Sequence, residues 1–474
     1  MTGSMDLLKQ FDLGYEGFAK ANAETMEALA KALQAGSGTD AASFTGGRAL
    51  TPESLDTTLV NVLHSTDEAR LFQRLKKTPV KSVVHQWDIR TEVGTDDGLW
   101  VSEGGTGTQT DQTITRKVIT ASYLQVMRQV TLQAASSGMI EDAMAIEAEA
   151  GALQLIRVIE TYLFKGSTTM VPQWPNGLDA QITAANGSTI LDLRGKDATS
   201  ASYEQALNDA ARSVRGNFGV PTHAFSSIFV MEDTQALLRD RLRWGPGYAE
   251  QGGTGVFNKY PTPYGTMELI DDVFIKEGGA PTPSAVTGYP SAGLAYTLAR
   301  ANSPSTSQFG ASDAGNYDYK IAPVNQYGEG AAVEVALTGI LAADRVTASI
   351  SAYPSPNAAT AFRVYRSKVG GTTGAVCLYA FIIDYNTVHV TNSDKIYDDN
   401  LYLPGTSTVY ILNLNPAYNA LEWAQFLPMM KFDLYPTSSA VYPFLMLLFG
   451  ALAVKKPQQM VRIINVSPSN LGWF

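Results

Sequence analysis

The sequence is poor in cysteine and in charged side chains. Cys377 is the single cysteine among 474 residues, which excludes a disulfide scaffold and a thiolate metal site. Charged residues make up 17% of the chain, below the ~25% typical of globular proteins. Because interface cores are depleted in charge, this low share favours a chain that covers much of its surface in subunit contacts or sheets. The net charge of -10 excludes a generally basic nucleic-acid binder.

Long apolar runs and targeting signals are also missing. The longest apolar stretch, Val441–Val454, is interrupted by Pro443 and is shorter than the ~20 residues that a membrane-spanning helix needs. The N-terminus lacks the apolar core of a secretory signal. We therefore expect a soluble protein that has no membrane partner and folds in a reducing compartment.

Motifs for catalysis and cofactor binding are absent from the sequence. The chain has no phosphate-binding loop, no Gly-x-Ser-x-Gly elbow and no His-Glu-x-x-His zinc motif. Its histidines are too widely spaced to predict a shared metal site, and packing explains His85, close to Trp87, better than ligation does. We therefore expect no enzyme activity, no catalytic residue, no cofactor and no metal.

Three pairs of adjacent aspartates stand at expected turns or strand ends: Asp96-Asp97, Asp271-Asp272 and Asp398-Asp399. Aspartate is common in turns because its side chain can bond to nearby backbone amides. We interpret all three pairs as solvated turn residues. A calcium site at residues 394–399 is the weaker alternative.

Residues 1–50 predict an N-terminal arm. Met26, Leu29 and Leu33 recur at helical spacing and form a narrow apolar stripe. Gly36 would end this helix, and the run of Gly, Ser, Thr and Ala that follows is typical of a flexible link. The stripe is expected to contact either a neighbouring subunit or the body of its own chain.

A helix and then a long hairpin are predicted for residues 51–132. The helix begins at Thr51, which is followed by a proline suited to a first helical turn, and leads towards residue 79. Residues 83–90 and 114–119 then alternate with a period of two, as strands do. Between them, residues 93–112 are rich in Gly, Thr and Asp. So long a connection makes sense if the hairpin, residues 80–132, lies across another molecule.

The next part of the chain mixes helices and strands. Residues 141–165 carry a broad apolar stripe from Ile146 to Leu163, which predicts a long helix. Further helices are predicted for residues 202–216 and 234–242, and strands for residues 224–231 and 267–275.

Residues 281–405 differ in texture from the rest. Charged residues become sparser and helical periodicity disappears, while short alternating strands recur between turn residues. This pattern predicts a β-sandwich. Because both flanks are linker-like and the earlier apolar texture resumes afterwards, we interpret the segment as a module inserted into a host domain.

Positive charge gathers in two places despite the net acidity. No acid follows Asp433, so Lys455, Lys456 and Arg462 leave the C-terminal stretch positive, and Arg70 and Arg74 belong to a second cluster. Such patches could face a packaged polyanion without reading its sequence. Solvated faces or ion pairs between subunits explain them at least as well.

The order of these elements resembles the HK97-type major capsid proteins of tailed bacteriophages. The local matches are the short turn at residues 176–178 and the ending formed by residues 451–457 and Val461–Val466. Strand signatures at residues 317–330 and 362–367 are similar to those of fibronectin-III or immunoglobulin-like domains.

The resemblance implies an α+β fold with an inserted all-β sandwich. It divides the chain into an arm (1–50), a leading helix (51–79), the E-loop hairpin (80–132), a P-domain with a spine helix (133–199), A-domain parts (200–280 and 406–442), the insert (281–405), and a P-domain return strand with the C-terminus (443–474).

The implied function is a structural protein whose hexamers and pentamers form an icosahedral virion shell around double-stranded DNA, assembled in the host cytoplasm. Implied partners are further copies of the chain, a portal protein, a separate scaffolding protein and a decoration or minor capsid protein. Trp87, Trp100 and Tyr123 are our candidate interface anchors, with the arm stripe, because aromatic residues are enriched at interfaces. The alternatives are an encapsulin-like nanocompartment shell and a glycan-binding adhesive protein that uses the insert.

Overall fold

The computed structural model describes residues 68–94, 96–97, 99–136, 142–239, 258–276, 281–290, 293–353, 358–370, 395–436 and 439–469, and the backbone alone of 379–383. The chain divides into two units, 1–62 and 63–474, and every described residue belongs to the second. The expected arm with Met26, Leu29 and Leu33, and the helix expected from Thr51, lie outside the described residues.

A four-stranded sheet, here called the long sheet, forms the first layer of the fold. Its order is β1 (Lys76–Pro79), β18 (Leu421–Asp433), β19 (Val441–Val454) and β4 (Ser122–Thr131). The β1–β18 pair is parallel and the other two pairs are antiparallel. The strand β4 therefore forms one edge of the sheet, and the short helix α4 (Leu132–Ser136) follows it.

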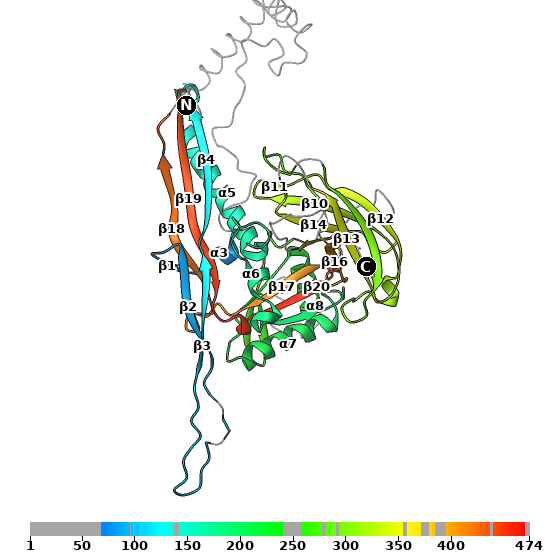
Figure 1. Cartoon of the computed structure of the whole chain (residues 1–474). Helices are drawn as coiled ribbons and strands as arrows, with labels where there is room; N and C mark the ends of the chain where they lie inside the picture. The colour runs from blue at the N-terminus through cyan, green and yellow to red at the C-terminus, as the bar shows by residue number, and fades with distance from the viewer. Residues whose placement is uncertain are drawn as a thin grey trace, which may run out of the picture. The chain divides into compact units, whose positions relative to one another are not determined.

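Helix α5 (Ala143–Lys165) lies along one face of the long sheet (Figure 1). The Asp142 side chain caps its start by accepting a hydrogen bond of 3.0 Å from the Met144 amide. Leu155 is buried against Phe444 and Met446 of β19. The helix approaches the sheet closely at Gly151, where a Cβ would stand 2.7 Å from the sulfur of Met446. The long helix expected at residues 141–165 is confirmed within two residues of its start.

A six-stranded mixed sheet forms the second layer. Its order is β5 (Thr189–Asp192), β20 (Val461–Val466), β17 (Ser407–Leu412), β6 (His223–Ser226), β8 (Gly265–Asp271) and β7 (Lys259–Thr262). Helices α7 (Ala201–Gly216) and α8 (Ile228–Arg239) share an apolar cluster with it. The short elements nearby are α6 (Leu178–Gln181), η2 (Ala184–Asn186) and η5 (Pro457–Gln459).

Several expectations for this region were wrong. The strand expected at residues 267–275 ends at Asp271. The strand expected at residues 224–231 ends at Ser226, because Ser227 accepts a 3.4 Å hydrogen bond from the Val230 amide and begins α8. The run Ile228–Phe229–Val230 has strand propensity, which tertiary packing overrides. We also expected a boundary between two parts of the host domain at residues 442 and 443. This boundary would separate β18 from β19, although the two strands pair. It would also group β19 with β20, although β20 pairs with β17 in the other sheet.

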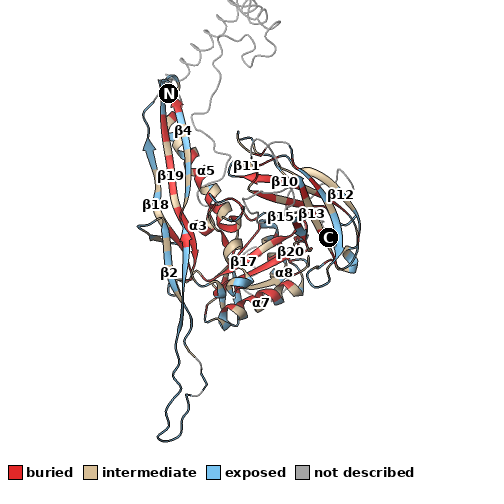
Figure 2. Cartoon of the chain, viewed as in Figure 1, coloured by how far each residue is buried: buried red, intermediate tan, exposed pale blue. Residues whose placement is uncertain are grey.

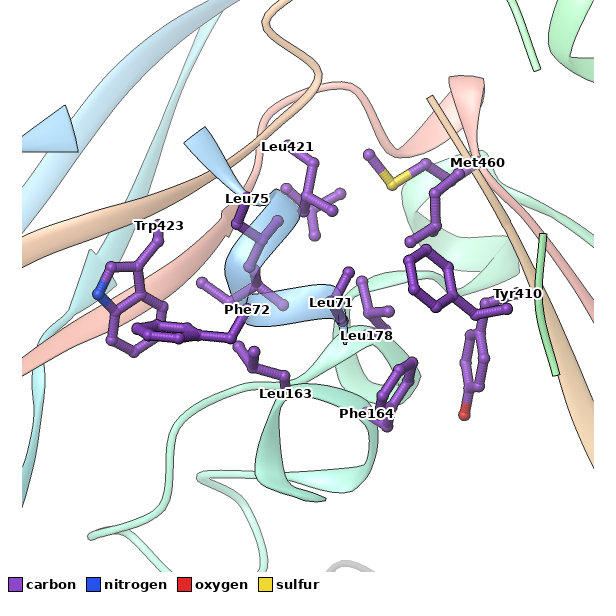
Figure 3. Close-up of a cluster of buried hydrophobic side chains, with 14 of the residues drawn as sticks. Leu71, Phe72, Leu75, Leu163, Phe164, Leu178, Tyr410, Leu421, Trp423 and Met460 are labelled. Carbon is purple, nitrogen blue, oxygen red and sulfur yellow. The ribbon is translucent and has the colours of Figure 1, made fainter. Parts of the chain in front are cut away.

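One buried apolar cluster joins the two sheets and α5 (Figure 3). Helix α3 (Arg70–Arg74) contributes Leu71 and Phe72, and Phe72 meets Trp423 of β18 edge to face with ring centroids 5.6 Å apart. On the other side, Phe164 of α5 packs against Tyr410 of β17 at 5.2 Å. The cluster therefore fixes where the long sheet stands relative to the six-stranded sheet.

The strands between residues 281 and 405 pair only with one another among the described residues. They form a five-stranded and a three-stranded sheet that share one apolar cluster. The host residues Met170, Val171 and Trp174 belong to the same cluster. The elements are β9 (Ala295–Asn302), η4 (Ala311–Asp313), β10 (Gly315–Asn325), β11 (Gly328–Glu329), β12 (Val333–Ile340), β13 (Asp344–Ala352), β14 (Ala361–Arg366), β15 (Tyr379–Ile383) and β16 (Lys395–Asp398).

An ion pair is buried inside this segment. Arg366 donates to Asp398 at 2.6 Å and to the Asn400 side chain at 2.6 Å, and both charged side chains are almost fully buried. Burial alone would lower the pKa of Arg366. The charge of Asp398 and the neighbouring tyrosines have a larger opposite effect, so the pKa of Arg366 is raised overall. The expectation that Asp398 and Asp399 are solvated turn residues was wrong, because Asp399 also pairs with Arg345 at 2.7 Å.

The substitution Asp398→Asn should lower the free energy of unfolding by about 3–5 kcal/mol, because it leaves the Arg366 charge buried without its partner. The matched control is Asp399→Asn, whose ion pair with Arg345 is partly exposed to solvent and should cost about 1 kcal/mol or less. Chemical denaturation of the unassembled chain measures both. Equal losses for the two variants would contradict this account.

Candidate assembly surfaces

Strands β2 (Val84–Glu92) and β3 (Thr113–Thr120) form an antiparallel hairpin. Their ladder runs from Val84 opposite Thr120 to Glu92 opposite Thr113. The expected hairpin is thus present but shorter than residues 80–132, since β4 pairs with β19 instead. Both strands alternate with the same period, so the sequence could not assign their partners.

The tip of the hairpin exposes apolar side chains. Trp100 is 97% exposed, and Leu99 and Val101 on either side are also exposed. Figure 2 shows that exposed residues continue along the hairpin strands. An exposed tryptophan is open to contact with a partner, so Trp100 stays a candidate interface anchor.

The base of the hairpin lies beside a buried carboxylate of the body. Glu422 of β18 lies 2.6 Å from the Lys455 Nζ and 3.5 Å from the His85 Nε2. The His85 ring stacks on Trp87 with centroids 5.6 Å apart. Trp87 is half-buried in its own chain, whereas Trp100 is exposed.

The face of the long sheet that points away from α5 is also apolar, and we call it the outer face. Tyr123 is 54% exposed and its ring meets Phe449 edge to face at 4.9 Å. Four residues further along β4, on the same face, a cross-strand row joins Met127, Leu445 and Phe432. Exposed apolar rows on one sheet face are typical of a protein-binding surface.

The sequence reasoning singled out Tyr123 but missed Met127 and Phe432. The alternation of β4 carried a signal for Met127, because residues 123, 125 and 127 share a face. Which of the two faces stays open depends on where α5 packs, and this was not visible from the strand pattern.

The five basic residues considered for polyanion contact are used differently from one another. Arg70 pairs with Asp271, and Arg74 pairs with Glu268 at 3.1 Å. Arg462 is 6% exposed and pairs with Asp179 at 2.8 Å, so its charge is not available to a polyanion. Lys455 belongs to the Glu422 contact described above. The exposed Lys456 contacts the Tyr418 ring at 5.9 Å.

A groove of about 990 Å³ runs between the hairpin and the body. Lys455 and Lys456 line it, together with Lys117 of β3. The rest of its polar lining includes five amide side chains and the charged residues Asp88, Arg90 and Arg116 of the hairpin; the amides are Asn186, Asn217, Asn419, Gln458 and Gln459.

Two buried carboxyl groups lie beneath α3. Glu160 of α5 accepts hydrogen bonds from the Leu71 amide at 2.7 Å and the Phe72 amide at 3.0 Å, and so caps α3. Burial, with Asp272 nearby, raises the pKa of Glu160 to about 9, and burial also raises the pKa of Asp272 to about 6. Both residues are 0% exposed, so the expectation that Asp272 is a solvated turn residue was wrong.

Replacing Glu160 with glutamine should weaken the pH dependence of stability. The folded chain keeps Glu160 protonated at pH values where the unfolded chain ionises it, so the free energy of unfolding should fall as pH rises from about 5 towards 9. Glu160→Gln cannot ionise and should flatten this fall. The substitution should also lower the free energy of unfolding by about 1–3 kcal/mol at pH 6. The reason is that the side-chain nitrogen of glutamine would face a backbone N–H that now donates to a carboxyl oxygen.

The control is Glu149→Gln, an exposed residue on the same helix. Urea denaturation between pH 5.5 and 9 should give wild-type behaviour for this variant. A Glu160→Gln protein that retains the full wild-type slope would contradict the assignment.

Sites for metals and membranes were sought in the described residues. No three His, Cys, Asp or Glu side chains there gather as they would around a metal ion. Within the same part of the chain, no helix combines the length and apolar character needed to cross a bilayer.

By sequence, the chain is similar to capsid proteins of phages. The major capsid protein of Staphylococcus phage K is 24% identical over 464 residues, which cover 93% of this chain and 95% of that protein. The putative major capsid protein of Enterococcus phage phiEF24C is 23% identical over the same shares. No protein-family model matches the sequence.

Solved structures that resemble this chain include the subunits of particle shells. The capsid of a native GTA particle has a TM-score of 0.47 at 11% identity, covering 90% of this chain and 98% of that one. The capsid of cyanophage P-SCSP1u has a TM-score of 0.45 at 11% identity, covering 90% of this chain and 96% of that one. The SrpI encapsulin from Synechococcus elongatus has a TM-score of 0.43 at 9% identity, covering 90% of this chain and 96% of that one.

Proposed function

We infer that this chain is a major capsid protein of a tailed bacteriophage, a structural subunit that assembles with copies of itself into the shell of the virion. The observation that carries this conclusion is the relation to proteins named major capsid protein, which spans 93% of this chain and 95% of theirs. A shared domain alone would not extend over the whole length of both proteins.

The described surfaces support this function. A subunit that must bind its neighbours needs apolar area that stays exposed in the single chain. The hairpin tip and the outer face of the long sheet both provide it, through Trp100, Tyr123 and Met127. The role is structural, and it needs no reacting group.

At a finer level we propose the HK97-type arrangement. The hairpin corresponds to the E-loop, α5 to the spine helix, and residues 281–405 to an inserted immunoglobulin-like sandwich. Hexamers and pentamers form an icosahedral shell assembled in the host cytoplasm, with hairpins lying over neighbouring subunits and N-terminal arms clasping them. A portal protein, a separate scaffolding protein and a decoration protein complete the partners. The mixed α+β architecture with more strand than helix agrees with this proposal.

The shell is proposed to enclose double-stranded DNA. Lys117 and Lys456 are the side chains best suited to contact the phosphates, because they line one groove. Lys455, Arg70, Arg74 and Arg462 are left out of this set, since each is paired with an acid of its own chain.

Two other functions are less well supported. An encapsulin-like shell would share the assembly surfaces, but the relatives found by sequence are phage capsid proteins. A glycan-binding adhesive would use residues 281–405 alone and would leave the hairpin and the outer face unexplained.

Shortening the hairpin should stop assembly and leave the subunit folded. Residues 93–112 are replaced by Asn-Gly, which suits a two-residue turn between Glu92 and Thr113 because these residues pair in the ladder. The tip is exposed, so the free energy of unfolding should change by less than about 1 kcal/mol.

Sedimentation velocity should give shells or capsomers for the wild type and a monomer for the shortened chain. The control replaces only the exposed tip residue Ser102 with alanine and should assemble normally. Normal shells from the shortened chain would contradict the proposed role of the hairpin, and a wild type that stays monomeric at every concentration would contradict the proposed function.

A further inference from the structure

A cavity of about 240 Å³ opens beside the edge strand β4. It lies between the α5-facing side of the long sheet and the C-terminal half of α5, where Ile159 and Tyr162 line it. Trp174 closes another side, and its ring stands 4.8 Å from that of Tyr162. Gln326, in the turn between β10 and β11, belongs to the rim. The cavity is therefore built by the long sheet, α5 and the inserted segment together.

The walls of this cavity are mostly apolar, with one buried donor. Trp423 is 1% exposed, and its indole Nε1 has no hydrogen-bond partner among the described residues. Gly450 allows this ring its position, since a Cβ there would stand 2.5 Å from the Trp423 Cζ2. An apolar group that fills the cavity would gain the burial of several aromatic faces.

We propose that Trp100 of a second copy of this chain fills the cavity. The hairpin tip ends in an apolar group, Leu99-Trp100-Val101, whose central side chain is 97% exposed and so occupies no pocket of its own chain. A large apolar side chain on one surface and an apolar cavity on another are the two halves of an interface hot spot.

The chain's own hairpin carries Trp100 away from this cavity. The cavity adjoins Ser122, two residues beyond the end of β3 and thus at the base of the hairpin. From Val84 to Glu92 the hairpin extends for about 27 Å at ~3.4 Å per residue, and Trp100 lies beyond that point. The occupant therefore comes from a neighbouring subunit, and the inference rests on the proposed assembly into a shell.

Engineered disulfide formation tests the contact between copies. In a Cys377→Ser background, Ser102→Cys on the tip is combined with Gln326→Cys on the cavity rim. The matched control combines Ser102→Cys with Ser312→Cys, which is exposed on the inserted segment and does not line the cavity. The assembled protein is oxidised and run on a non-reducing gel.

The Gln326 pair should give a ladder of linked subunits in assembled particles, and the control pair should give little or none. Particles that form normally but yield no more linkage through Gln326 than through Ser312 would overturn the inference and leave the proposed function standing. A wild type that forms no particles would overturn both.

A second measurement follows Trp100 itself. Trp100→Ala should raise the concentration needed for assembly by roughly tenfold or more, because interface tryptophans often dominate binding. Val93→Ala, a similarly exposed tip residue, should have little effect. The fluorescence difference between wild type and Trp100→Phe should shift to shorter wavelength on assembly. An emission that stays at the solvent-exposed wavelength in particles would overturn the inference.

Discussion

The structure depends on the apolar cluster in which α3, α5 and the two host sheets meet. Leu71 and Phe72 reach it from α3, Phe164 from α5, and Trp423 and Tyr410 from the two sheets. Because the cluster holds the two sheets together, it also fixes the outer face of the long sheet relative to the six-stranded sheet. A subunit that must fit several neighbours needs this rigidity, since a misplaced surface would lose its partner.

The sequence has few charged residues, and several of them are paired inside the chain. Arg366 and Asp398 are paired within the inserted segment, Arg462 with Asp179 in the host, and Glu422 lies at the hairpin base. Ionised side chains that are already paired leave the assembly surfaces apolar. The low charge of the sequence thus reflects both buried pairs and open apolar faces, and the two features serve the same purpose.

Periodicity predicted the elements whose pattern is strong and local. Helix α5 and strands β2 and β3 were placed within two residues by their apolar spacing. Pairing partners were not predictable, because β4 alternates as β3 does and only the position of β19 decides which strand it joins. The burial of Glu160 and Asp272 was hidden for the same reason, since each is an ordinary acid until three separate segments enclose it. Trp100 was singled out from its residue type and its place in the tip, but the cavity proposed to receive it consists of residues distant in sequence.

Electron microscopy of the purified full-length chain tests the central claim most directly. The account predicts closed icosahedral particles of uniform size, whose reconstruction shows each hairpin lying over a neighbouring subunit. A homogeneous small monomer, or particles in which the hairpins project freely into solvent, would contradict it.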